Sequence, residues 1–152
     1  HILRIIRELI EFQPERPATN IGEAMRYLTN AVKKRSIVFL ISDLYDCFDN
    51  QPRFEEQLKM IARKHDLIAI RVFDKLEREL PRAGLLFLQD PETGQQALID
   101  TSDRIFSQEY HQHFQTYDEA LKNIFTRYGI DSVEIATDQD YVPPLIQLLK
   151  KR

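Results

Sequence analysis

Three features are scarce in this sequence, and each scarcity bears on the class of protein. A single cysteine in 152 residues cannot form an internal disulfide, so we expect a reducing, cytoplasmic setting. No apolar run approaches the roughly 20 residues that span a bilayer, and no signal peptide opens the chain. The net charge of -3 provides no basic excess and so gives no support for a nucleic-acid-binding surface.

Groups suited to catalysis are scarce as well. Cys47 could act as a nucleophile, but no histidine lies near it in the sequence, and a loop cysteine without a catalytic role is the simpler interpretation. His111 and His113 are two residues apart, so they point in different directions from a helix and make a poor metal pair. The sequence therefore has no recognisable pair of nucleophile and base.

What is present is an ordinary globular composition, with 43% hydrophobic and 30% charged residues. The length of 152 residues suits one domain that buries its own core. Helical spacing of apolar residues begins at Ile2, with no capping residue before it. We therefore expect residues 1–152 to be the carboxyl-terminal portion of a domain whose first strands lie upstream.

The rest of the chain can be placed around the stretch Lys34–Asp46. It contains an unbroken apolar run, Ile37–Ile41, which is typical of a central parallel strand covered on both faces. Ser42 and Asp43 follow directly, and ligand sites in parallel sheets gather at the carboxyl ends of strands. The alternative is that Asp43 only opens a turn or caps the next helix.

Strand and helix patterns alternate along the chain, which predicts an α/β fold with a mostly parallel sheet, helices on both faces and an inserted β-hairpin. Asn20 and Glu23 form a capping-box pattern, and Gly129 is expected to end a long helix. The predicted helices are residues 2–10, 20–32, 53–64, 103–128 and 143–152; the strands are 37–41, 67–73 and 132–136; the hairpin joins 85–88 to 97–99.

Acidic residues follow all three predicted parallel strands. Asp43, Asp74 and Asp138 should therefore lie near one edge of the sheet, together with Ser42. Thr19 is expected on a loop that could share this edge, although it could instead be an N-cap. Such oxygen ligands suit Mg²⁺ or another divalent cation. Loops of an acidic protein carry such residues in any case, so the pattern alone does not establish a metal site.

Several segments resemble one protein family. They are Arg63-Lys64-His65-Asp66, Glu77-Arg78-Glu79-Leu80-Pro81, Asp90-Pro91-Glu92-Thr93-Gly94 and the run from Thr137 to Leu145. Together these resemble the carboxyl-terminal part of the bacterial domain-of-unknown-function family fifty-eight, whose members carry a von Willebrand factor A-like domain. The resemblance implies a metal-ion-dependent adhesion site to which Thr19 and Asp43 would contribute. It also implies a MoxR-type AAA ATPase as partner.

The sequence departs from this family pattern at one site motif. The Asp-x-Ser-x-Ser motif of the first strand is absent. The most similar segment, Asp100-Thr101-Ser102, is followed by Arg104 where the motif has its second serine. We therefore expect this chain to bind Mg²⁺ weakly or not at all. The absent first strand would lie beside Ile37–Ile41, which makes that strand an edge. We expect self-association, either by pairing of these strands or by exchange of the opening helix.

Three function hypotheses follow. The first is a protein-interaction module with an incomplete adhesion-type metal site. The second is a Mg²⁺-dependent phosphatase or phosphodiesterase-like enzyme, for which the helix starting near Asn20 would offer an anion-binding end. The third is a scaffold whose site is vestigial.

Overall fold

A computed structural model describes residues 1–13, 19–45, 51–90 and 94–152. Cys47 and residues 91–93 of the hairpin turn lie outside these ranges, so the predictions made for them stay predictions. The main sheet has three parallel strands in the order β1-β2-β5, namely β1 (Ile37–Ser42), β2 (Asp66–Phe73) and β5 (Asp131–Ala136). The predicted α/β fold with a parallel sheet is confirmed.

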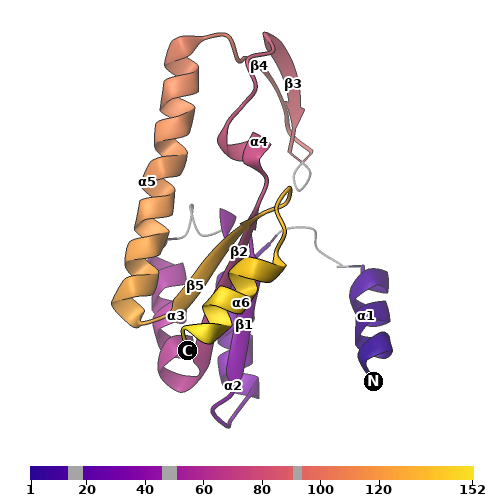
Figure 1. Ribbon diagram of the computed structural model, residues 1–152, viewed down its shortest axis with the longest axis vertical. Coiled ribbons are helices and arrows are strands. Elements are labelled where there is room, and N and C mark those ends of the chain that lie inside the picture. Colours follow the sequence, from indigo (N-terminus) through magenta and orange to yellow (C-terminus); the bar gives the residue numbers. More distant parts are fainter. Residues whose placement is uncertain (14–18, 46–50, 91–93) are drawn as a thin grey trace.

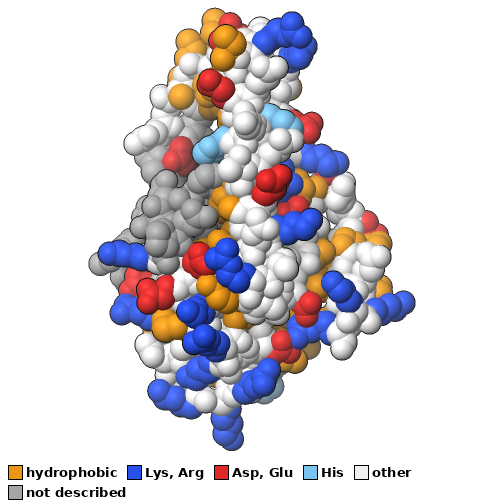
Figure 2. Space-filling view, turned by 90° about the vertical axis from the view of Figure 1, so that its left-hand side faces the viewer, with side chains coloured by type: hydrophobic (Ala, Val, Ile, Leu, Met, Phe, Trp, Pro, Cys, Tyr) orange, Lys and Arg blue, Asp and Glu red, His pale blue; other side chains and the backbone are white. Residues whose placement is uncertain are grey.

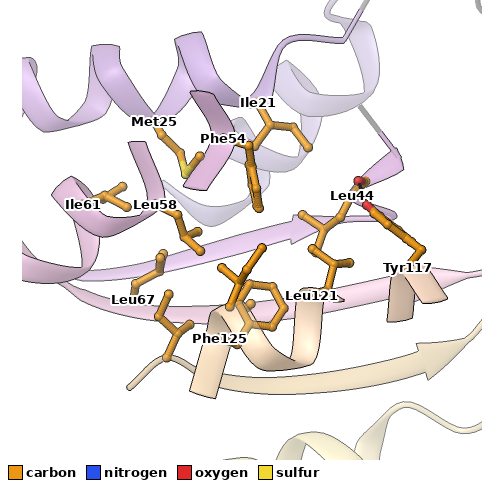
Figure 3. Packing of buried hydrophobic residues seen from close by; sticks show 13 residues of the cluster. Ile21, Met25, Leu44, Phe54, Leu58, Ile61, Leu67, Tyr117, Leu121 and Phe125 are labelled. Carbon is orange, nitrogen blue, oxygen red and sulfur yellow. Dashed lines mark hydrogen bonds between the residues drawn. The ribbon is translucent and has the colours of Figure 1, made fainter. Parts of the chain in front are cut away.

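Helices cover both faces of this sheet (Figure 1). On one face lie α2 (Ile21–Ala31), α3 (Gln51–Lys64) and α5 (Arg104–Tyr128), and on the other lies α6 (Val142–Lys150). Because side chains alternate along a strand, β2 supplies Leu67 and Ala69 to the first core and Ile68 and Ile70 to the second. Figure 3 shows the first core, where Phe54, Leu58 and Leu121 fill the space between helices and sheet.

The long helix α5 has the boundaries that its sequence predicts. Its N-cap is Asp103, whose side chain accepts hydrogen bonds from the N–H groups of Ile105 and Phe106. Gly129 ends it with a φ of 65°, a left-handed conformation that glycine adopts without steric cost. The helix thereby carries Tyr117 and Asp118 to the carboxyl-terminal half of the sheet.

β1 lies at one edge of the sheet, as expected, but the prediction that it is covered on both faces is wrong for this chain. Val38 and Leu40 pack against the first core, whereas the side chains of the other face are open. Ile37 is 64% exposed, Phe39 51% and Ile41 64%. The reason is that α6 packs over β2 and β5 and leaves β1 uncovered on that face.

Three smaller elements extend from this body. Helix α4 (Lys75–Arg78) follows β2, and β3 (Leu85–Gln89) pairs antiparallel with β4 (Gln96–Asp100), which confirms the predicted hairpin. Figure 1 shows the hairpin beyond one end of the main sheet and α1 (Ile2–Glu11) standing apart from it. Within the described ranges, no helix combines the length and the apolar character needed to cross a membrane.

Candidate functional site at the carboxyl edge of the sheet

The chain leaves β1 through a tight turn built on Ser42 and Asp43. The Ser42 hydroxyl oxygen accepts a hydrogen bond from the Leu44 N–H at 3.0 Å and donates one to the Asp43 carboxylate at 3.2 Å. The same carboxylate oxygen accepts the Tyr45 N–H at 3.2 Å. Asp43 therefore organises a turn, as its alternative interpretation predicts, while its side chain remains exposed to solvent.

Leu44 fixes the direction in which this turn leaves the strand. It is the only non-glycine residue with a positive φ, 65°, in the part of the chain that the structure describes. Its side chain is 1% exposed in the first core, and the Tyr117 hydroxyl donates a hydrogen bond to its backbone oxygen (Figure 3). A strained conformation persists only where the surroundings hold it, and such residues cluster at functional sites.

Arg71 supports the same turn from the middle strand. Its Nε donates to the backbone oxygen of Asp43 at 3.1 Å, and its Nη1 donates to Asp118 at 2.5 Å and to Glu134 at 3.1 Å. The strand register places Ser42, Arg71 and Glu134 in one row across the sheet. The Arg71 side chain is only 4% exposed, and its guanidinium lies 5.0 Å from the centre of the Tyr117 ring.

A second arginine completes a balanced group of charges. Arg78 from α4 places its Nη1 3.3 Å from Asp118 and 3.5 Å from Glu134, with its guanidinium 3.4 Å from the centre of the Phe73 ring. Burial alone would lower the pKa of Arg71, but the hydrogen bond and charge of Asp118 hold this pKa above its ordinary value. The group thus brings two guanidinium groups together with two carboxylates.

Tyr45 lies beside the Asp43 carboxylate, on the exit from the turn. Its ring packs 5.7 Å from Phe114 and 6.4 Å from Tyr117, measured between ring centres. Burial, together with the neighbouring Tyr110 and the negative charges of Glu77 and Asp43, raises the pKa of Tyr45 to about 12. Tyr45 thus stays neutral at physiological pH.

Thr19 is exposed and lies directly before α2, whose N-cap is Asn20. The Asn20 side chain accepts the Glu23 N–H at 2.8 Å, so the N-cap role falls to Asn20 and not to Thr19. Figure 3 shows Ile21, the first residue of α2, toward the same end of the sheet as Leu44. Thr19 directly precedes the N-cap residue of this helix in the sequence.

Asp74 and Asp138 belong to a separate group at the ends of β2 and β5. Asp74 caps α4 by accepting the Leu76 N–H at 2.8 Å, and it also accepts a hydrogen bond from the Thr137 hydroxyl at 3.3 Å. Asp138 pairs with Lys75 at 2.8 Å. These contacts give both carboxylates a structural role, and the hydrogen bonds described above tie Asp43 to its own turn and not to them.

The set of oxygen donors at Asp43 is small. Among the described residues, no three His, Cys, Asp or Glu side chains come together in a group that could hold a metal ion. Asp43 and Ser42 nevertheless present a carboxylate and a hydroxyl side by side, the hard oxygen donors that Mg²⁺ prefers.

The sequence-based prediction missed Arg71, Arg78, Asp118 and Glu134. One signal was available, because Arg71 interrupts the otherwise apolar run from Leu67 to Phe73, and a charge inside a buried strand needs a partner. The identity of that partner was not available, since Asp118 lies 47 residues away on a helix of uncertain rotation.

Comparisons with known proteins show which family the chain belongs to. The chain is 25% identical over 133 residues to an uncharacterized protein of Mycobacterium avium, a match that covers 88% of this chain and 76% of that protein. It is also 25% identical over 148 residues to uncharacterized proteins of Mycobacterium bovis and Mycobacterium tuberculosis, covering 94% of this chain and 44% of each of those proteins. No solved structure matches. Residues 1–120 match the family described as protein of unknown function DUF58, and the chain therefore belongs to that family.

Proposed function

We propose that this chain is part of a protein-interaction module, in a von Willebrand A-like domain, that binds its partner through a divalent cation at the carboxyl edge of the sheet. Thr19, Ser42 and Asp43 would contribute oxygen ligands. The observation that supports this most is the turn at Asp43: its backbone is fixed by Arg71 and Tyr117, yet its carboxylate faces solvent.

Such a turn suits adhesion because a rigid ligand group costs little entropy when it binds. A bound Mg²⁺ would supply a positive charge to which a carboxylate of the partner could be attached, and no covalent bond would be made or broken. Most of the turn's own polar groups already have hydrogen-bond partners within the chain. The turn would thus keep its shape whether or not a partner is present.

The resemblance of the sequence to its family implies a MoxR-type AAA ATPase as the partner class, in a cytoplasmic setting. The chain belongs to the DUF58 family, whose description names no partner. The phosphatase-like enzyme and the vestigial scaffold stay alternatives, and neither has a specific observation in its favour.

The test is binding of a purified MoxR-type AAA ATPase to this protein, measured by biolayer interferometry. We expect binding in Mg²⁺, loss of binding in EDTA, and at least a tenfold weaker affinity for Asp43→Asn. Glu119→Gln is the matched control, because Glu119 is an exposed carboxylate on α5 outside the turn. Binding that is unaffected by both EDTA and Asp43→Asn would refute the proposed function.

A further inference from the structure

A groove of about 590 Å³ lies between the first half of α5 and the segment formed by the end of α4 and the residues after it. Figure 1 shows this half of α5 extending past the end of the main sheet toward the hairpin. α4 and α5 are in contact, and the Tyr110 hydroxyl donates a hydrogen bond to the backbone oxygen of Glu77. A contact within the chain therefore holds the two walls of the groove together.

The groove lies toward the side of the sheet opposite to β1. Arg78, which lines it, packs against the Phe73 ring of β2 and pairs with Glu134 of β5. β5 is at the opposite edge of the sheet from β1. All residues that line the groove belong to the segments 78–82 and 104–115. Its walls therefore do not depend on the strand that is expected beside β1.

The α5 wall of the groove is a polar stripe along one helix face. Its residues recur at the spacing of three and four that brings side chains together on a helix. They are Arg104, Ser107, Gln108, His111, Gln112 and Gln115. With a rise of 1.5 Å per residue, this stripe is about 16 Å long. An extended peptide of about five residues has the same length.

The glutamines of this stripe suit a peptide backbone. A glutamine amide has two N–H donors and a carbonyl acceptor, so it can bond both the C=O and the N–H groups of a peptide. Gln108 and Gln112 are exposed, and within the described ranges neither amide has a hydrogen-bond partner. Gln115 instead places its Nε2 2.9 Å from Nε2 of His111. A phosphate, which has no carbon-bound N–H groups, would leave the amide oxygens unused.

Two arginines share the end of the groove that is next to the hairpin. Arg104 is the first residue of α5, and Arg82 comes shortly before β3. The buried Thr101 joins their segments, because its hydroxyl accepts the Ala83 N–H at 3.0 Å and donates to the backbone oxygen of Gly84 at 2.8 Å. Both arginines are exposed, and neither forms an ion pair with another described residue.

These arginines give the groove an excess of positive charge. Arg78 is already paired with two carboxylates. Arg82 and Arg104 carry two positive charges, against the one negative charge of Glu79 in the same lining, so one positive charge remains. This excess attracts a carboxylate, which a guanidinium group can bind through two parallel hydrogen bonds.

We propose that the groove binds an extended acidic peptide segment of a partner protein. Arg82 and Arg104 would hold a carboxylate of the peptide, and Gln108 and Gln112 would bond its backbone. The site is separate from the Asp43 turn, and the proposal does not rest on the proposed function. Peptide binding here requires no divalent cation, so EDTA should leave it unchanged while it abolishes binding at a cation site.

The experiment is an NMR titration of the chain in EDTA with a hexapeptide of alternating serine and glutamate, blocked at both ends. We expect the side-chain amide signals of Gln108 and Gln112 to shift as the peptide binds. The matched peptide with glutamine in place of each glutamate should bind at least about tenfold more weakly. Added salt should weaken binding of the acidic peptide, because the arginines are exposed.

Substitutions then test the role of each group. Arg82→Gln and Arg104→Gln should each weaken binding of the acidic peptide about fivefold, and Gln112→Ala about threefold. Arg63→Gln is the matched control, since Arg63 is an exposed arginine of α3 outside the groove and its loss removes the same charge. It should leave the affinity unchanged. Circular dichroism confirms that each variant is folded.

Three results would overturn the proposal. One is the absence of any shift at Gln108 and Gln112 up to the solubility limit of the acidic peptide. Another is an equal loss of affinity in Arg63→Gln and Arg104→Gln, which would mean that only the overall charge matters. The third is inorganic phosphate that displaces the peptide with the same affinity and is unaffected by Gln112→Ala, which would make the groove a simple anion site.

Discussion

Arg71 is a buried charged residue whose contacts join the sheet, α5 and the turn at Asp43. Its Nη1 donates hydrogen bonds to carboxylates on α5 and β5. Its Nε donates one to the backbone oxygen of Asp43, directly after β1. Burying such a cation is favourable only when it is paired, and removal of one partner leaves the others without compensation. The position of the Asp43 turn therefore depends on a residue of the neighbouring strand that was not among the predicted ligands.

Arg71→Ala should lower the free energy of unfolding by about 3 to 5 kcal/mol, because it breaks a largely buried ion-pair group. Arg127→Ala is the control. Its pair with Glu55 is 2.8 Å long but Arg127 is 61% exposed, so the loss should be at most about 1 kcal/mol. Urea unfolding measures both values, and equal losses would contradict the structural role given to Arg71.

The raised pKa of Tyr45 predicts that the free energy of unfolding depends on pH in alkaline solution. Its folded pKa of about 12 lies above the ordinary value of 10.0, so the unfolded chain loses this proton first as pH rises. The contribution of protonated Tyr45 to the free energy of unfolding is therefore fully present below pH 10, and it is lost as pH rises from about 10 to 12. Tyr45→Phe should reduce the fall in unfolding free energy across this range, measured by urea unfolding at several pH values.

An unchanged alkaline slope in Tyr45→Phe would contradict the assignment to Tyr45 and would point to Tyr110, whose pKa burial also raises. Asp43→Asn provides a second check, because the Asp43 charge is one cause of the raised pKa. This substitution should lower the pH at which the absorbance of the Tyr45 tyrosinate appears.

At the scale of elements, the sequence predicts most of the fold. Apolar runs without polar alternation located β1 and β2, and helical spacing with the stop at Gly129 located α5. These signals are local, and local signals suffice for the existence and type of an element. The capping role of Asp74 was missed because α4 has only four residues and no apolar period.

The candidate site was only partly predictable because it depends on contacts distant in sequence. The placement of Ser42 and Asp43 at a strand end followed from β1 alone. The support from Arg71 and Tyr117 required the register of β1 with β2 and the rotation of α5, which a single sequence does not specify. The open face of β1 likewise depends on where α6 packs.

The exposure of α1 leads to a prediction about stability. Its apolar side chains, including Leu9 at 75%, face solvent, whereas Leu121 of α5 is 3% exposed. Leu9→Ala should change the unfolding free energy by less than about 0.5 kcal/mol, and Leu121→Ala should cost about 2 to 5 kcal/mol. Thermal unfolding compares them, and a similar loss for both would mean that α1 packs against the remaining chain in solution.

At the scale of the whole molecule, charge is unevenly distributed over the surface. Figure 2 shows basic side chains gathered toward the lower end of the view and apolar side chains at the end that holds the hairpin. The hairpin exposes Leu85, Phe87 and Leu98, each by more than 60%. Among the described residues, exposed apolar side chains thus occur at β1, at the hairpin and on α1, and the carboxyl edge with Asp43 borders the first.

The most direct test of the central claim, that the Asp43 turn is the cation position, is titration with Mn²⁺ followed by amide NMR signals of the chain. We predict weak, millimolar binding that broadens the signals of Ser42, Asp43 and Leu44 first, and loss of this effect in Asp43→Asn. Tight stoichiometric binding, or broadening that Asp43→Asn leaves unchanged, would contradict the account.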